Sequence, residues 1–343
     1  MPPVPPEAAA QPSRAQTAAS GAVPWPAQVS VREVGLRDGL QILQRVVPTA
    51  HKIEWMRAAH AAGVREMEVG SFVPARLMPQ LADTAELLAF AKTLPGLVAS
   101  VLVPNLKGAE RAIDCDADAM LIPLSASHAH SLANMKRTPD EVVADIARMV
   151  DLREQRRART RIEVGISTAF GCTIQGRVEP DEVVRLVRAV LQAGADSVGL
   201  ADTVGYADPR AVGELFAQVR AVAGDRVSTA HFHDTRGMGM ANVLAALQQG
   251  VTRLDACLGG IGGCPHAPGA SGNVSTEDLV YLFTSMGVAT GQDFGRLISL
   301  RQQLAGEGGF AALPWTQQQS SRRSSQGPGQ VVGGLTLQIT MHL

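Results

Sequence analysis

His231-Phe232-His233-Asp234-Thr235-Arg236-Gly237-Met238-Gly239 directly follows Arg226–Ala230, which has the length and composition of a short β-strand. Residues two apart in a strand point to the same side, so His231 and His233 are expected to project together, with Phe232 facing the opposite layer. The glycines let the chain turn into a helix expected from Met240 to Gln249. Two imidazoles on one face are suited to bind a metal, but they are equally compatible with polar residues at a strand end.

The same order of strand, loop and helix runs through most of the chain. Strands are expected at Val29–Val34, Val64–Val69, Leu97–Val103, Ala119–Pro123, Arg161–Ser167, Ser197–Ala201, Arg226–Ala230 and Thr252–Cys257. Helices are expected at Thr49–Ala62, Gln80–Thr93, Leu106–Cys115, Pro139–Ala158, Pro180–Ala193, Pro209–Ala223, Met240–Gln249 and Thr276–Met286. Eight alternating pairs predict an α/β protein with a (β/α)8 TIM barrel. An open, doubly wound sheet is the alternative, because the sequence does not give the strand order.

The two ends of the chain differ in composition from this pattern. Residues 1–26 are rich in Pro, Ala, Gln and Ser and are expected to form a disordered tail. Residues 27–305 are expected to form the barrel domain with its C-terminal helices. Residues 306–343 are expected to be an irregular C-terminal extension, Gln-, Ser- and Gly-rich from about Thr316.

Composition indicates a globular enzyme. Of 343 residues, 45% are hydrophobic and 18% charged, and the formal net charge of −1 argues against a nucleic-acid or anionic-membrane partner. Four cysteines without C-x-x-C spacing indicate free thiols in a reducing compartment. No apolar run is long enough to span a membrane, and no secretory signal is recognisable. We therefore expect a cytoplasmic protein. The acid-poor N-terminus with Arg14 makes the mitochondrial matrix the less favoured alternative.

Polar residues gather where the expected strands end, which is where TIM barrels carry their active sites. In chain order they are Arg37, Asp38, Gln41, Glu68, Ser71, Asn105, Lys107, Ser125, Ser127, His128, Thr168, Cys172, Asp202, Thr203, His231, His233, Asp234, Cys264 and Asn273. This one-sided clustering predicts an enzyme.

Four of these side chains suit a divalent cation. Asp38 offers a carboxylate, His231 and His233 offer nitrogens, and Asn273 offers an amide oxygen. Such a mixed set fits octahedral Mg²⁺ or Mn²⁺ with two positions left for substrate oxygens, whereas Zn²⁺ fits less well without a thiolate. An ion that binds a carbonyl and a 3-hydroxyl of one substrate would favour cleavage of the carbon–carbon bond between them.

Arg37 and Cys264 are the candidate catalytic groups beside this set. Arg37 could stabilise an enolate oxygen, or pair structurally with Glu68 or Asp202, or do both. Cys264 lies in the glycine-rich run Gly259–Pro265, which lacks the Lys-Ser/Thr of a P-loop. Its thiol could donate a proton to the product carbanion, or it could be a small residue in a tight turn.

Several of these stretches resemble the hydroxymethylglutaryl-CoA lyase family. The matching segments are Val34-Gly35-Leu36-Arg37-Asp38-Gly39-Leu40-Gln41, Glu68 ahead of Ser71-Phe72-Val73, Pro104-Asn105-Leu106-Lys107-Gly108, His231–Thr235, and Gly259–Pro265 followed by Gly269-Ala270-Ser271-Gly272-Asn273 and Thr276-Glu277-Asp278-Leu279-Val280. They span roughly residues 29–304 and match in order at five strand ends.

The resemblance implies a metal-dependent lyase of leucine catabolism and ketone-body formation. It would cleave 3-hydroxy-3-methylglutaryl-CoA to acetyl-CoA and acetoacetate. We also expect the protein to form a homo-oligomer, a dimer. It implies Asp38, His231, His233 and Asn273 as metal ligands, with His231 also counted as catalytic. It further implies Arg37 at the enolate, Cys264 in proton transfer, Glu68 and Asp202 as support, and Asn105 and Lys107 near CoA.

Departures from the family pattern leave the acyl group open. Gly171-Cys172-Thr173-Ile174-Gln175-Gly176 replaces Gly-Cys-Pro-Tyr-Glu-Gly, Arg236 replaces Tyr, His266 replaces an aromatic, and Val69-Gly70 replaces two threonines. Citramalyl-CoA or a longer-chain hydroxyglutaryl-CoA is therefore an alternative substrate. A condensing synthase of the isopropylmalate or homocitrate type, and a non-catalytic barrel, are the alternative functions.

Overall fold

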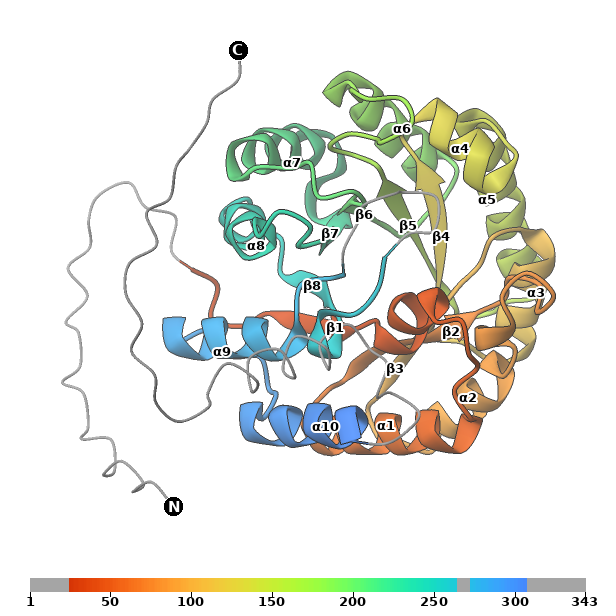
Figure 1. Cartoon of the computed structure of the whole chain (residues 1–343). Coiled ribbons are helices and arrows are strands. Elements are labelled where there is room, and N and C mark those ends of the chain that lie inside the picture. The colour runs from red at the N-terminus through yellow and green to blue at the C-terminus, as the bar shows by residue number, and fades with distance from the viewer. Residues whose placement is uncertain (1–24, 264–271, 307–343) are drawn as a thin grey trace, which may run out of the picture.

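Eight parallel strands close into a barrel in the computed structural model, which describes residues 25–263 and 272–306 (Figure 1). The strands are β1 Ser30–Glu33, β2 Glu66–Ser71, β3 Val98–Leu102, β4 Ala119–Ser125, β5 Arg161–Ser167, β6 Ser197–Asp202, β7 Val227–Phe232 and β8 Arg253–Ala256. Each pairs with its neighbours in sequence, and β1 also pairs with β8. The predicted (β/α)8 barrel is therefore confirmed, and the open sheet is excluded.

Alternation along each strand separates the barrel interior from the helical layer. On β5, Ile162, Val164 and Ile166 are fully buried in the hydrophobic core, whereas Glu163 and Gly165 line the interior cavity. Branched apolar side chains on the outward face are what pack against surrounding helices in this fold. The inward positions are thus free to carry polar or small residues.

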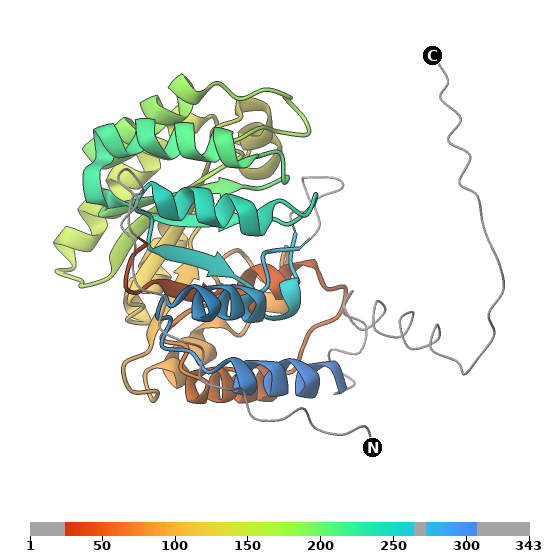
Figure 2. The same cartoon turned by 90° about the vertical axis from the view of Figure 1, so that its left-hand side faces the viewer.

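The surrounding helices begin with recognisable capping signals. Their bounds are α1 Thr49–Ala61, α2 Thr84–Ala91, α3 Leu106–Asp114, α4 His128–Met135, α5 Pro139–Gln155, α6 Pro180–Gln192, α7 Pro209–Ala223, α8 Gly239–Gln248, α9 Thr276–Met286 and α10 Phe294–Gly306. Thr138 and Glu141 form a capping box at the start of α5, and the Asp208 side chain caps α7. The α10 helix lies against α1 and closes the outer layer (Figures 1 and 2).

The structure differs from the expected elements in several places. The α4 helix was not expected, α10 was expected only as an unplaced C-terminal helix, and α2 begins at Thr84 after a short 3-10 turn rather than at Gln80. Strands β4 and β6 continue to Ser125 and Asp202, two and one residues past their expected ends. A single π-helical turn, η1 Gly35–Gly39, follows β1. The short, weakly periodic α4 explains why its pattern gave no helical signal.

The expected N-terminal tail and C-terminal extension fall outside the described residues, except for Trp25, Pro26 and Gly306. Within the described ranges, none of the helices combines the length and the apolar character needed to cross a bilayer.

Candidate active site

Three predicted metal ligands meet at the carboxyl-terminal end of the barrel. One candidate ligand atom each from Asp38, His231 and His233 lies within 4.8 Å of the other two. Asp38 comes from η1 directly after β1, and the histidines come from the end of β7. The two imidazole rings lie 5.2 Å apart, as expected for neighbours on one face of a strand.

The π-helical turn aims the Asp38 carboxylate inward. The backbone N–H groups of Arg37 and Asp38 both donate to the carbonyl of Val34, which closes this tight turn. A π-helical turn at a functional site is a common device for aiming a side chain. Burial alone would raise the pKa of Asp38, but the charge of Arg37, the nearby histidines and a hydrogen bond from Asn273 outweigh it and lower the pKa. Asp38 is therefore held as a carboxylate.

Asn273 reaches the same point from the far side of the glycine-rich segment. Its Nδ2 donates to Asp38 Oδ2 at 2.6 Å and to the Ile261 carbonyl at 3.0 Å. The backbone of Asn273 bridges to His233, flanked by hydrogen bonds from Asp234 to Gly272 and from Val274 to Phe232. The fourth predicted ligand is thereby joined to the strand that carries the histidines.

The unsatisfied atoms of the site fit a divalent cation. Asn273 Oδ1 is buried without a hydrogen-bond partner, although such groups are nearly always paired in folded proteins, and His233 Nε2 lies 3.9 Å from Asp38 Oδ2. Burial and the nearby His231 lower the pKa of His233 to about 4, so this imidazole is neutral and able to ligate. The donor set of one carboxylate, two imidazoles and an amide oxygen suits Mg²⁺ or Mn²⁺.

Arg37 lies beside this set and is anchored by Glu68. Its Nε is 2.7 Å from Glu68 Oε2, and its Nη1 is 2.6 Å from Asp38 Oδ1. Of the two partners considered for this guanidinium, the structure therefore places Glu68 against it and not Asp202. Burial raises the pKa of Glu68 more than Arg37 lowers it, so this carboxylate depends on the guanidinium to stay ionised.

The other predicted site residues lie outside the set formed by Asp38, His231 and His233. The Asp202 carboxylate accepts hydrogen bonds from the backbone N–H groups of Tyr206 and Ala207, so it shapes the loop after β6 rather than touching the ligand set. Asn105 lines the cavity and also caps α3 by accepting from Gly108 N–H. Lys107 is exposed and is not among the described residues that line the cavity. Cys264 lies outside the described residues.

A buried ionic network beneath the ligands was missed by sequence reasoning. Arg32 on β1 donates to Asp255 on β8 at 2.7 Å and to Glu163 on β5 at 3.0 Å. His231 Nδ1 lies 3.1 Å from Asp255 Oδ2, which leaves Nε2 free toward Asp38. The signal in the sequence is limited to one charged residue inside each of two short strands, Arg32 in β1 and Asp255 in β8.

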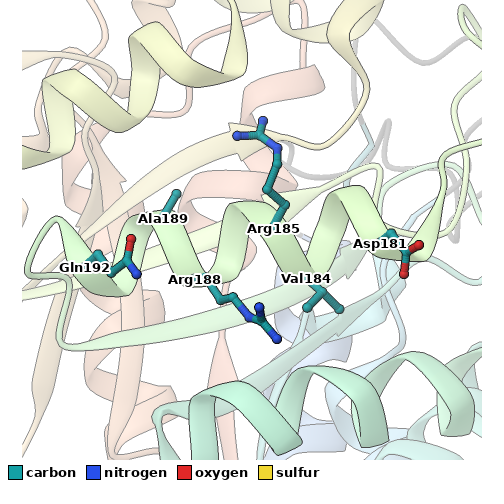
Figure 3. Close-up of a pocket in the computed structure, with 6 residues that line it drawn as sticks. All are labelled: Asp181, Val184, Arg185, Arg188, Ala189 and Gln192. Carbon is teal, nitrogen blue, oxygen red and sulfur yellow. The ribbon is translucent and has the colours of Figure 1, made fainter.

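A cavity of about 710 Å³ runs from this network past the ligands to the mouth of the barrel. Apolar residues of the β2–α2 loop, among them Val73 and Leu77, line it together with Arg76, and α4 contributes His130 and Asn134. Its size fits a drug-sized or larger ligand with polar groups at one end. A second hollow lies on the outer surface of α6 (Figure 3). Because it is lined only by residues of that helix, from Asp181 to Gln192, it is remote from the barrel interior.

The closed barrel with an Asp-His-His set and an adjacent arginine at its carboxyl-terminal end defines a TIM-barrel enzyme with a candidate divalent-metal site. The chain belongs to the HMGL-like family, whose model matches residues 28–304. The resemblance drawn from the sequence motifs is therefore confirmed. By this membership the protein is a carbon–carbon lyase.

Relatives and solved structures agree with this assignment. A mitochondrial hydroxymethylglutaryl-CoA lyase of Arabidopsis thaliana is 38% identical over 80% of this chain, which spans only 58% of that relative. A 3-hydroxy-3-isohexenylglutaryl-CoA/hydroxymethylglutaryl-CoA lyase of Pseudomonas aeruginosa is 35% identical over 81% of this chain and 92% of its own length. The structure of an HMG-CoA lyase from Acinetobacter baumannii, in complex with coenzyme A and 3-methylmalate, is 37% identical. It covers 88% of this chain and 98% of its own, with a TM-score of 0.79.

Proposed function

We propose that this protein cleaves 3-hydroxy-3-methylglutaryl-CoA, or a close 3-hydroxyacyl-CoA, to acetyl-CoA and a keto acid, which is acetoacetate for the methyl substrate. The observation that carries the proposal is the convergence of Asp38, His231 and His233 beside Arg37 in one cavity. Mg²⁺ or Mn²⁺ is the proposed cofactor, held by these three residues and Asn273. When bound, the ion would polarise the substrate carbonyl and acidify the 3-hydroxyl.

The proposed reaction breaks the bond between C2 and C3 of the acyl group, and the movement of electrons in that step defines the role of each residue. The 3-hydroxyl gives its proton to His231, the proposed base, the bond between C2 and C3 breaks, and C3 becomes the carbonyl of the keto acid. The electron pair moves to C2 and the thioester carbonyl, which becomes an enolate. The Arg37 guanidinium is always charged and lines the cavity, so it is suited to stabilise that enolate oxygen.

Glu68 and Asp255 act as positioning residues in this scheme. The ion pair with Glu68 fixes the guanidinium of Arg37 where the enolate forms. The hydrogen bond to Asp255 fixes which nitrogen of His231 faces Asp38. The C2 carbanion then needs a proton, and we propose that the thiol of Cys264 supplies it. Gln41 bonds to both Asp38 and the Gly263 carbonyl, so the residue before Cys264 is tied to the ligand set.

The named relatives support the choice of substrate. Both sequence relatives carry hydroxymethylglutaryl-CoA in their names, and the Acinetobacter structure holds coenzyme A. The cavity mouth offers apolar surface and Arg76 to such a thioester. We propose Asn105 at the cavity wall as a CoA contact. Lys107, being outside the cavity lining, is the weaker candidate.

Release of acetyl-CoA tests the proposal. The purified protein, treated with a chelator and then given Mg²⁺ or Mn²⁺, is assayed with 3-hydroxy-3-methylglutaryl-CoA, its 3-isohexenyl analogue and citramalyl-CoA. We expect metal-dependent cleavage of at least the methyl or isohexenyl substrate. Condensation of acetyl-CoA with 2-keto acids, in the absence of any cleavage, would instead establish a synthase. A lack of bound metal together with no activity on any thioester would overturn both.

Assembly and location remain predictions of the sequence. We propose a homodimer, which light scattering of the purified protein would test. We also propose a cytoplasmic location; relatives of this chain occur both in bacteria and in mitochondria.

A further inference from the structure

The cavity continues below the metal ligands into the centre of the barrel. On β5 it is lined in turn by Ser167, Gly165 and Glu163, which are successive inward positions. The interior of an eight-stranded TIM barrel is normally filled by layers of branched side chains. In this chain the cavity instead extends to the level of Gly165.

A row of small residues across four strands creates that space. Pro123 of β4, Gly165 of β5, Gly199 of β6 and Thr229 of β7 are successive register partners. Gly165 and Pro123 remain partly exposed although they lie in the middle of strands inside the barrel. Four neighbouring inward positions thus carry no long side chain.

Neither the backbone conformation nor the packing around position 165 requires a glycine there. A Cβ on Gly165 would meet no heavy atom within 4 Å, and its backbone is not in the left-handed region. Gly199 differs, because a Cβ there would lie 3.0 Å from Thr229 Cβ. A glycine within a strand costs stability and often marks the close approach of a ligand. The open position at Gly165 is therefore one that a ligand can approach closely.

The walls and floor of this space indicate the character of that ligand. Leu102, Leu121 and Pro123 provide apolar walls. At the floor, the guanidinium of Arg32 is paired with Glu163 and Asp255, and Arg253 also lies 3.7 Å from Glu163. Both guanidinium groups are thus already engaged by carboxylates, so the substrate's own carboxylate is not expected to occupy the lumen. A neutral, largely apolar chain fits.

We infer that the lumen beside Gly165 is a subsite for a neutral alkyl or alkenyl substituent on C3 of the acyl group, several carbons longer than methyl. This inference rests on the proposed function and extends it to a substrate class, the 3-hydroxy-3-alkylglutaryl-CoA thioesters. It assigns Gly165 as a residue that sets specificity by its lack of a side chain.

The test compares substrates that differ only at C3. The wild-type protein with Mn²⁺ is assayed with thioesters bearing methyl, propyl and isohexenyl at C3, alongside the variants Gly165→Ala, Gly165→Val and Gly165→Leu. We expect the wild-type kcat/KM for the isohexenyl substrate to equal or exceed that for the methyl one. Gly165→Leu should lower the isohexenyl-to-methyl ratio of kcat/KM by about tenfold or more, with smaller effects of Val and Ala, because lost room for a few methylenes has effects of that size.

Gly213→Leu on α7 is the matched control, since a Cβ there meets only the end of Gln249 at 3.8 Å. It should leave the ratio unchanged, and thermal unfolding confirms that each variant is folded. If the wild type cleaves the methyl substrate but rejects the longer ones, or if Gly165→Leu leaves the ratio as it was, the subsite is refuted and the lyase function stands. If no thioester is cleaved at all, the lyase function and the subsite fail together.

Discussion

Oδ2 of Asp255 lies 3.1 Å from Nδ1 of His231, and the same carboxylate accepts a 2.7 Å hydrogen bond from Arg32. The imidazole at the mouth of the barrel is thus oriented by a charge network at its floor. The hydrogen bond and charge of Asp255 outweigh the effect of burial and raise the pKa of His231. A carboxylate that holds the second nitrogen of a ligating histidine is a common feature of metal centres.

Asp255→Asn should therefore weaken metal binding without dismantling the barrel. The amide keeps the size of the side chain but loses the charge that fixes the His231 tautomer. We expect a 10- to 100-fold loss in Mn²⁺ affinity, on the order seen for such outer partners, and a comparable loss in kcat. Titration calorimetry measures the affinity. Asp225→Asn, at a carboxylate that is 97% exposed, serves as control and should change neither.

Arg37→Met should lower turnover by about 10²- to 10³-fold, as loss of a group that stabilises developing charge does. It should also lower the free energy of unfolding by about 3–5 kcal/mol, because Glu68 is left buried without its partner. The double variant Arg37→Met/Glu68→Gln should regain much of that stability and none of the activity. Urea unfolding and steady-state assays separate the two effects. A double variant as unstable as the single one would show that the ion pair is not what the Met substitution disturbs.

Added Mn²⁺ should stabilise the native protein by mass action. At a concentration 100 times Kd, the expected gain is about 2.7 kcal/mol, which thermal unfolding detects as a rise in Tm. His233→Ala and Asn273→Ala should each remove most of this rise, because both residues belong to the proposed ligand set. His128→Ala, at an exposed histidine outside the site, should keep it in full. An undiminished rise in His233→Ala would place the metal elsewhere.

Glu33 should make stability depend on pH. It accepts hydrogen bonds from Gly35 N–H, Leu258 N–H and the Thr276 hydroxyl, yet burial raises its pKa from 4.5 to about 7. Between about pH 4.5 and 7 the unfolded chain loses this proton while the native protein keeps it, so the free energy of unfolding falls as pH rises. The fall attributable to Glu33 is at most about 3 kcal/mol.

Comparison with Glu33→Gln isolates this contribution, because glutamine does not titrate. Denaturant unfolding at pH 5 and pH 7.5 should show the wild type losing stability relative to the variant as pH rises. A difference that stayed constant, or moved the other way, would mean that the three donors keep Glu33 ionised throughout.

Cys264→Ala should lower kcat strongly if its thiol delivers the proton to the C2 carbanion, with a smaller effect on KM. Proton transfer by a positioned group contributes about 10²- to 10⁴-fold. Cys115→Ala, at a half-buried free thiol on the end of α3, is the matched control and should be silent. Equal, small effects of both substitutions would remove Cys264 from the mechanism.

The alternation of strands and helices and the convergence of Asp38, His231 and His233 were accessible from the sequence because both follow from local pattern, whereas the strand order came from the structure. Alternation placed His231 and His233 on one face, and the repeated strand-loop-helix order brought Asp38 to the same end of the barrel. The confirmed barrel is what joins these separate stretches.

What the sequence did not reveal depends on packing across the barrel. Arg32 and Asp255 look like ordinary polar residues in short strands, and only closure of β8 on β1 makes them partners. Likewise, the sequence offered two ion-pair partners for Arg37, and the structure shows that the partner is Glu68 rather than Asp202. The open space beside Gly165 could not be predicted from the sequence either, because it depends on which small residues are register partners across four strands.

Gly263 and Gly272 are fastened independently of each other: the carbonyl of the first accepts from Gln41, and that of the second accepts from the backbone of Asp234. Both residues that flank positions 264–271 are therefore anchored by hydrogen bonds. A change in the number of residues between Gly263 and Gly272 therefore need not move Asn273, whose backbone is held beside the strand that carries the histidines. Under the proposed function, the proton donor and the cation site could vary independently.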